Sequence, residues 1–250
     1  MYNHLEKRLK MGTFIIGHRG AMGERPENTA ASFLKAISDG ADGIEFDVHL
    51  TADGIPVVIH DEKVDRTTDG KGFVGGMTLA EIKKLDAGYE DYPDEKILTL
   101  EEVLALTIDK CKIINIELKQ GPVFYQGLEE KVFDIISNFE IMEKVIISSF
   151  NHYTINYIKK RCVEVKCGLL YMAGLYKPWS YAQSVGAEAI HPFAASVNQE
   201  IVEGCHKNDI SVNVFGVNTE EAVSKMLAYG VDGIITDFPG LAVKNRNRRK

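Results

Sequence analysis

The sequence contains no long run of apolar residues. No stretch approaches the ~18 apolar residues that a membrane-spanning helix needs, and residues 1–10 are polar and charged, with no signal-type apolar region behind them. The four cysteines show neither a CxxC pair nor zinc-finger spacing. Cys111, Cys162 and Cys167 lie in or near apolar runs, so we expect them to be small, buried, reduced thiols. The formal net charge of −7 argues against a duplex nucleic-acid partner, which needs a basic face on the protein. These absences favour a cytoplasmic enzyme or binding protein without stable membrane association.

The chain also lacks a glycine-rich nucleotide-binding loop after its first apolar run. Eight apolar runs alternate with helical patterns, and such continuous apolar runs are typical of buried parallel strands. They are residues 13–17, the run that carries Glu45, and residues 112–118, 145–149, 165–171, 189–191, 210–217 and 233–236. Because 250 residues suit one barrel, we predict an α/β fold with a single (β/α)8 TIM-barrel domain over residues 1–250. A doubly wound open sheet is the competing arrangement.

Residues 62–98 interrupt this alternation. They are rich in Gly, Asp and Lys with one short helical patch, which predicts a small insertion after the second strand. A tight turn at Asp53-Gly54 precedes it and predicts a hairpin. Asn28 is expected to cap the helix over residues 29–38, and a capping box from Thr99 to Glu102 starts the helix after the insertion.

Carboxylates follow the second and third predicted strands. Glu45 and Asp47 stand two residues apart in a β-type run, so both side chains point to the same face. Glu117 ends the next barrel strand, and the active site of a β/α barrel lies at the carboxyl ends of its strands. Three carboxylates this close would repel one another unless a cation lay between them. Oxygen ligands of this kind suit Mg²⁺ or Ca²⁺, so we predict one divalent cation here.

Two basic side chains and two histidines belong to the same strand ends. Arg19 and Lys119 could hold an anion between them, and His18 and His60 can titrate near neutrality. Together with a divalent cation these groups describe a phosphodiester-cleaving site. One imidazole would deprotonate the attacking hydroxyl and the other would protonate the departing alkoxide.

Other polar and aromatic residues have a structural interpretation. His49 and His191 are expected to be structural histidines at strand ends. Asp61 and Asp237 are expected to cap or hydrogen-bond turns. Trp179 is as readily a packing residue as a substrate platform.

These motifs, in this order, resemble those of the glycerophosphodiester phosphodiesterases. The resemblance runs from residue 13 to about residue 240 and rests on His18-Arg-Gly20, Pro26-Glu-Asn-Thr29, Glu45-Phe-Asp47, Asp53-Gly54, His60-Asp61, Glu117-Leu-Lys119, Ser149-Phe150 and Thr236-Asp237. It implies a TIM barrel with an insertion, and hydrolysis of a glycerophosphodiester, such as glycerophosphocholine or glycerophosphoethanolamine, to sn-glycerol 3-phosphate and an alcohol.

Matching positions imply the role of each residue. Glu45, Asp47 and Glu117 would be the metal ligands, His18 and His60 the acid/base pair, and Arg19 and Lys119 the phosphate binders. Phe215 stands where the family often has tryptophan, so it offers a smaller aromatic face to the substrate.

Two other functions are compatible with a phosphate-binding barrel. One is a phospholipase-like phosphodiesterase that acts on lipid, and the other is a non-catalytic barrel that binds a phosphate-bearing ligand. The sequence leaves open which imidazole is the acid, whether water or a vicinal hydroxyl of the substrate attacks, which alcohol leaves, and the oligomeric state.

Overall fold

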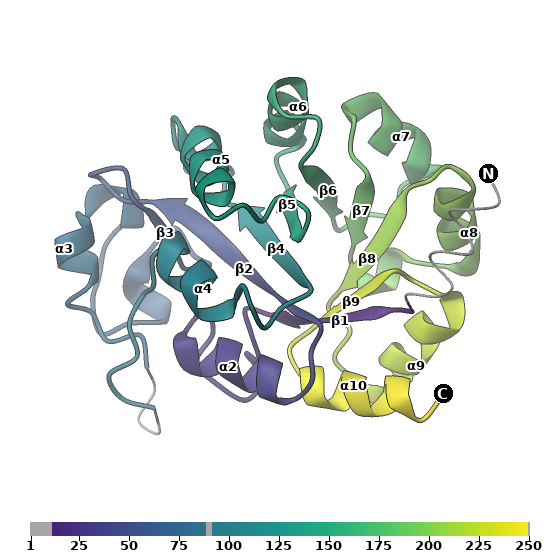
Figure 1. Ribbon diagram of the computed structural model, residues 1–250, viewed down its shortest axis with the longest axis horizontal. Coiled ribbons are helices and arrows are strands. Elements are labelled where there is room, and N and C mark those ends of the chain that lie inside the picture. The colour runs from purple at the N-terminus through teal and green to yellow at the C-terminus, as the bar shows by residue number, and fades with distance from the viewer. Residues whose placement is uncertain (1–11, 89–91, 250) are drawn as a thin grey trace.

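The computed structural model describes residues 12–88 and 92–249, and eight parallel strands in them close into a barrel (Figure 1). The barrel strands are β1 (Phe14–His18), β2 (Gly43–Leu50), β4 (Ile113–Leu118), β5 (Val145–Ser149), β6 (Lys166–Tyr171), β7 (Ala189–Pro192), β8 (Ser211–Phe215) and β9 (Gly233–Thr236). β1 pairs in parallel with both β9 and β2, which closes the ring. The predicted TIM barrel is therefore confirmed, and the open sheet is excluded.

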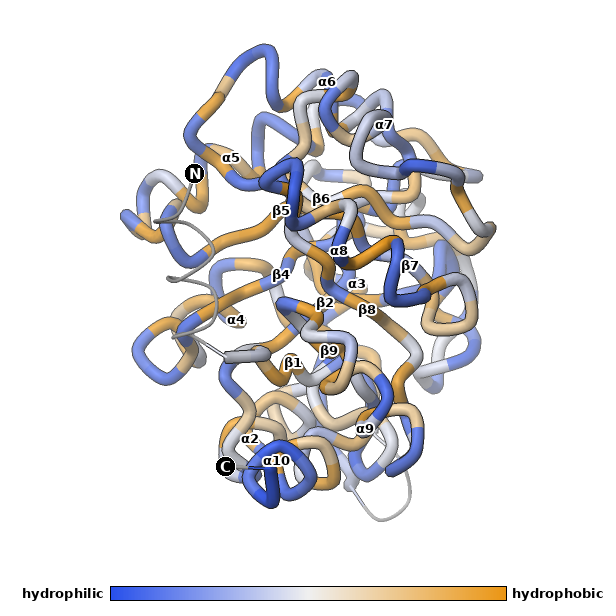
Figure 2. Tube along the Cα trace, turned by 90° about the vertical axis from the view of Figure 1, so that its right-hand side faces the viewer, coloured by the Kyte–Doolittle hydropathy of each residue, from blue (hydrophilic) through white to orange (hydrophobic). Residues whose placement is uncertain are grey.

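Eight helices in the described residues surround the barrel. They are α2 (Ala30–Ser38), α4 (Leu100–Thr107), α5 (Leu128–Asn138), α6 (His152–Arg161), α7 (Pro178–Val185), α8 (Gln199–Lys207), α9 (Glu220–Tyr229) and α10 (Pro239–Asn247). The strands are largely hydrophobic along their length (Figure 2), and their outward side chains pack with the helices into one continuous core. Burying apolar surface on this scale is the main favourable contribution to folding.

Two helices begin later than the sequence predicted. Asn28 does not cap α2, because it adopts φ 59° and turns its side chain to the site; the hydroxyl of Thr29 accepts the capping hydrogen bond instead. The residue pattern over 124–138 also predicts a helix, but α5 begins only at Leu128. The side chain of Gln120 hydrogen-bonds both backbone groups of Tyr125, at 2.7 Å each, so these groups cannot join a helix. The capping box between Thr99 and Glu102 is present as predicted.

The hairpin and the insertion form a lobe at one side of the barrel. β3 (Pro56–Val58) pairs antiparallel with β2, and Gly54 takes φ 76° in the predicted turn. The insertion contains η1 (Val64–Arg66), η2 (Val74–Gly76) and α3 (Leu79–Ile82). It has a small apolar core of its own, formed by Val57, Ile59, Val64, Val74, Ile82, Ala87 and Ile97. This core gives the polar insertion a fixed structure beside the strand ends.

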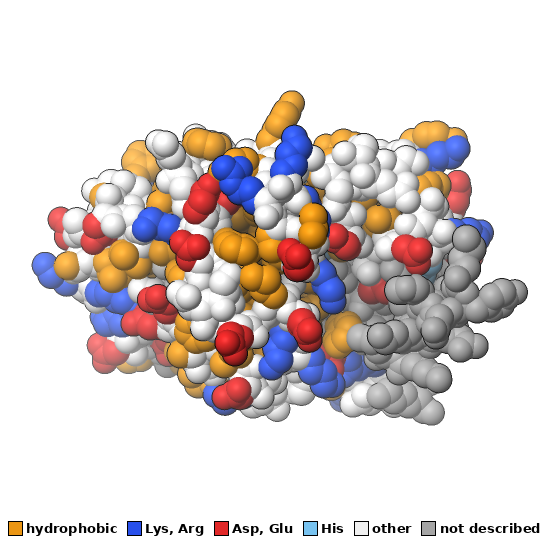
Figure 3. Space-filling view, turned by 45° about the horizontal axis from the view of Figure 1, so that its top comes forward, with side chains coloured by type: hydrophobic (Ala, Val, Ile, Leu, Met, Phe, Trp, Pro, Cys, Tyr) orange, Lys and Arg blue, Asp and Glu red, His pale blue; other side chains and the backbone are white. Residues whose placement is uncertain are grey.

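The described surface has a mixed composition. Acidic, basic and hydrophobic side chains are interspersed on the face seen in Figure 3. All four cysteines are buried and none of them forms a disulfide, which confirms the prediction for Cys111, Cys162 and Cys167. Within the described residues, no helix is long and apolar enough to cross a membrane. The polar stretch over residues 1–10 lies outside the described residues.

Candidate active site

The three predicted carboxylates meet at the carboxyl ends of β2 and β4. Glu45 and Asp47 point to the same face of β2, and the register places Asp47 directly beside Glu117 of β4. All three side chains are buried, and one carboxylate oxygen from each lies within 4.8 Å of the others. The strand period and the parallel register are therefore sufficient to assemble this acidic triad.

The electrostatics of the triad are those of a site built for a cation. Burial and the neighbouring charge of Asp47 raise the pKa of Glu45 to about 8. Burial also raises the pKa of Glu117, against the effect of Lys119. The pKa of Asp47 is lowered, because Lys119 and Arg19 outweigh the effect of burial. Three buried carboxylates with oxygen-only donors fit Mg²⁺ or Ca²⁺, whose double charge would relieve the repulsion.

Arg19 and Lys119 border the triad, as predicted. Nζ of Lys119 lies 2.7 Å from Oε1 of Glu117 and 3.0 Å from Oδ1 of Asp47. The backbone N–H of Arg19 donates to Glu45 at 3.0 Å, and its Nε lies 3.4 Å from Asp47. Its NH1 group donates to Glu27 at 2.8 Å. Both cations therefore have fixed positions at the place where a phosphate would meet the triad.

Each predicted catalytic histidine is paired with an aspartate. Nδ1 of His18 lies 2.6 Å from Oδ1 of Asp237, and Nδ1 of His60 lies 2.6 Å from Oδ1 of Asp61. Such a pair orients the imidazole and leaves its Nε2 atom available for proton transfer. Asp61 and Asp237 were expected to cap or hydrogen-bond turns, but the carboxylate of each hydrogen-bonds a histidine instead. Two sequence features could have indicated this role. Asp61 directly follows His60, and Asp237 follows the last barrel strand, whose neighbour β1 ends at His18.

The two imidazoles have opposite pKa shifts. Burial lowers the pKa of His18, but the hydrogen bond that its Nδ1 donates to Asp237 and the charge of Glu45 prevail, so the pKa is raised overall. For His60 the effect of burial prevails over the nearby charge of Asp47, and the pKa is lowered. Groups whose environments move their pKa values apart suit the roles of acid and base.

An arginine of the insertion, which sequence analysis did not select, joins the site from outside. Arg66 in η1 makes two hydrogen bonds to Asp61 (2.7 and 3.0 Å) and two to Glu27 (2.7 and 2.8 Å). Asp61 in turn holds His60, and Glu27 holds Arg19. One guanidinium therefore supports both a proton-transfer group and a phosphate-binding group. No local motif marks Arg66, because its partners are brought to it by the fold.

A cavity of about 170 Å³ lies over these groups. It is lined by His18, Arg19, Glu45, His60, Asn115, Glu117, Lys119, Phe150, Leu170, Phe215 and Ile235. The predicted aromatic contact, Phe215, is thus at the cavity, where its ring packs against Phe150 and Phe193. Seven of the eight predicted site residues line the cavity, and the eighth, Asp47, lies buried behind it.

His49 and His191 have structural roles, as expected, and Trp179, for which packing and substrate contact were both open, is a packing residue. His191 is buried in the barrel, accepts a hydrogen bond from Asn213 and has its pKa lowered to about 3 by burial. His49 hydrogen-bonds the hydroxyl of Tyr125 and the backbone carbonyl of His60. Trp179 packs against the core between α7 and α8. None of these three belongs to the cavity lining.

Known proteins with the same architecture share this chain's sequence pattern. The model of the glycerophosphoryl diester phosphodiesterase family matches residues 18–241. A glycerophosphodiester phosphodiesterase of Caldanaerobacter subterraneus subsp. tengcongensis is 50% identical over 232 residues, which are 92% of this chain and 96% of that protein. One of Bacillus altitudinis is 42% identical and covers 95% of this chain and 100% of its own.

A solved structure agrees with these relatives. The phosphodiesterase of Oleispira antarctica, in complex with the product sn-glycerol-3-phosphate, has a TM-score of 0.84 at 29% identity and covers 96% of this chain and 99% of its own. Since the family model spans most of the sequence and the relatives match nearly end to end, the chain belongs to the glycerophosphoryl diester phosphodiesterase family, a family of enzymes that hydrolyse phosphodiesters.

Proposed function

We propose that this enzyme hydrolyses small glycerophosphodiesters, such as glycerophosphocholine and glycerophosphoethanolamine, to sn-glycerol 3-phosphate and an alcohol. The observation that carries the proposal is the convergence of two aspartate-paired imidazoles and two fixed cations around a buried acidic triad. The Oleispira antarctica structure holds the product sn-glycerol-3-phosphate, and this supports sn-glycerol 3-phosphate as the product here.

Glu45, Asp47 and Glu117 would hold one divalent cation, Mg²⁺ or Ca²⁺. When bound, this ion supplies positive charge that neutralises the non-bridging phosphate oxygens. Arg19 and Lys119 would bind the same phosphate from the protein side, the first through a planar fork and the second as a point charge. The phosphate is thus oriented before any proton moves.

His18 and His60 would move the protons. The raised pKa of His18 favours the protonated imidazole, which donates its Nε2 proton to the departing alkoxide oxygen. The lowered pKa of His60 favours the neutral imidazole, which accepts the proton of the attacking hydroxyl at Nε2. That hydroxyl belongs either to water or to the substrate's own glycerol, and the proton balance is the same in both cases.

A direct assay tests the proposal. The purified protein is incubated with glycerophosphocholine, and release of sn-glycerol 3-phosphate and choline is measured before and after exhaustive chelation. We expect activity that chelation abolishes and that Mg²⁺ or Ca²⁺ restores. Full activity after chelation would contradict the metal role, and no activity with any glycerophosphodiester would contradict the function. A cytoplasmic location and the lack of nucleic-acid and stable membrane partners stay predictions.

A further inference from the structure

A second, larger cavity opens directly from the catalytic one. Its volume is about 690 Å³, and it shares Glu117, Lys119 and Phe150 with the catalytic cavity. Its other walls follow β4 and β5 and reach Tyr181 on α7. The catalytic cavity has about a quarter of that volume, so it is the narrower of the two. Because Lys119 lines both cavities, a phosphate beside it would place one substituent in each.

Most polar side chains that line the larger cavity already have partners. Gln120 is bound to Tyr125 and Glu129, and the hydroxyl of Ser149 donates to the carbonyl of Leu118. Asn151 caps α6. These groups hold the cavity wall in place, and their hydrogen-bonding capacity is largely used.

Glu62 is the exception. No hydrogen bond or ion pair from any described residue reaches its carboxylate. The neighbouring Lys63 places its ammonium 4.8 Å from the ring centroid of Phe73 in the insertion. The lysine that does line the cavity, Lys119, is already paired with Glu117 and Asp47. The larger cavity therefore carries a net negative charge from Glu62, which lies at the start of the insertion.

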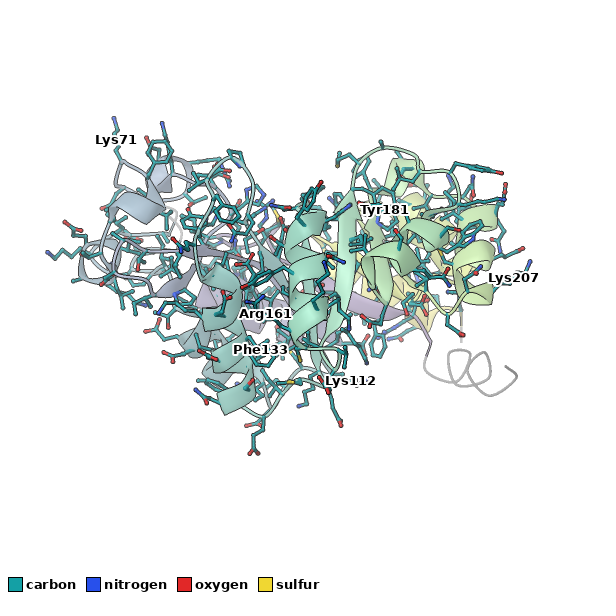
Figure 4. All side chains as sticks on the ribbon, turned by 90° about the horizontal axis from the view of Figure 1, so that it is seen from above. Lys71, Lys112, Phe133, Arg161, Tyr181 and Lys207 are labelled. Carbon is teal, nitrogen blue, oxygen red and sulfur yellow. The ribbon has the colours of Figure 1, made fainter. Side chains whose placement is uncertain are left out.

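Aromatic rings line the same space. Phe150, Tyr153 and Tyr181 are 49%, 89% and 42% exposed, which is unusual for rings of this size. Tyr181 is held in position, because its hydroxyl lies 2.9 Å from Nδ1 of His152, on the neighbouring α6. Nε2 of that histidine donates to the carbonyl of Leu170 at 2.8 Å. Figure 4 shows Tyr181 between the two helices. Exposed ring faces in a cavity that also holds an unpaired carboxylate suit an ammonium group.

We propose that the larger cavity is the subsite for the leaving alcohol and that Glu62 and Tyr181 make it selective for a cationic alcohol, with a quaternary or primary ammonium. The catalytic cavity is less suited to such a group, because Arg19 and Lys119 are already paired with its carboxylates, which would also hold the divalent cation. The glycerol end would then contact the apolar side of the catalytic cavity, at Phe215. This inference rests on the proposed function.

The test compares two substrates that differ only in the charge of the alcohol. kcat/KM is measured for glycerophosphocholine and glycerophosphoglycerol with the wild type, Glu62→Gln and Tyr181→Leu. We expect Glu62→Gln to lower kcat/KM about 5-fold for glycerophosphocholine and to leave the value for glycerophosphoglycerol within about 2-fold. Tyr181→Leu should reduce the same preference by about 3-fold.

The matched control is Glu143→Gln, because Glu143 is an exposed carboxylate that precedes β5, at the opposite end of the barrel. It should change neither value, and the melting temperature of every variant should stay near that of the wild type. If the wild type hydrolyses both substrates and Glu62→Gln leaves their ratio unchanged, the subsite assignment is overturned while the proposed function stands. If neither substrate is hydrolysed, the proposed function falls, and the subsite with it.

Discussion

Replacing Arg66 by methionine tests whether the insertion supports catalysis. The change keeps an apolar stem of similar length and removes all four hydrogen bonds to Asp61 and Glu27. His60 is then held by Asp61 alone, which has lost its two hydrogen bonds from Arg66. Arg19 depends on Glu27, which is 5% exposed and would retain Arg19 as its only charged partner among the described residues.

The magnitude follows from the exposure of the groups. Hydrogen bonds to charged partners contribute ~1.5–3 kcal/mol each when buried. The side chain of Arg66 is 47% exposed, so solvent screening reduces the total loss of stability to about 1–3 kcal/mol. At ~2–4 °C per kcal/mol for a chain of this size, the melting temperature should fall by about 2–12 °C. Loosening the groups that hold functional side chains typically costs ~10–100-fold, which we expect here for kcat/KM.

The pH profile should also shift. Arg66 is the main reason that the pKa of Asp61 lies below its usual range. Without Arg66, Asp61 is still ionised at neutral pH, and its negative charge acts on His60 with less compensation. The pKa of His60 therefore rises, and because a general base must be unprotonated, the acidic limb of kcat/KM moves to higher pH.

The assay is glycerophosphocholine hydrolysis from pH 5 to 9, with thermal unfolding measured in parallel. The matched control is Lys71→Met, which removes a basic side chain from the outer edge of the same insertion (Figure 4). Arg66→Lys keeps the charge but cannot reproduce the two-sided fork, so we expect an intermediate loss. A folded Arg66→Met enzyme with kcat/KM within 2-fold of the wild type and an unmoved acidic limb would refute the positioning role.

Three further predictions concern the predicted site. His18→Ala and His60→Ala should each lower kcat by about 10²–10⁴-fold with thermal unfolding unchanged, and near-normal turnover would remove that residue from the acid/base pair. Glu45→Gln should raise the divalent-ion concentration needed for half-maximal activity, and an identical metal titration would exclude it as a ligand. Asp237→Asn removes a partner that raises the pKa of His18, so the alkaline limb of kcat/KM, where the acid is lost, should move to lower pH; an unchanged limb would contradict this.

The sequence by itself determined the barrel and most of the catalytic cavity. Alternating apolar runs and helical patterns imply parallel strands, and such strands place their carboxyl ends together. The two-residue period of a strand then puts Glu45 and Asp47 on one face, beside Glu117 of the adjacent strand. The local hairpin likewise returned His60 to the same edge. These features depend on the periodicity of residues that are close in the chain, and a single sequence is enough to show it.

Only the tertiary structure decided which side chains support these groups. Asp237 lies 219 residues from His18 and meets it because β1 pairs with β9 when the barrel closes. Arg66 lies 39 residues from Glu27, and the folded insertion carries it to that carboxylate. The side chain of Asn28 donates a hydrogen bond to Asp47 instead of capping a helix, because the fold brings the two side chains together. Hydrogen bonds between distant side chains depend on positions in space, and the local pattern of residues does not encode these positions.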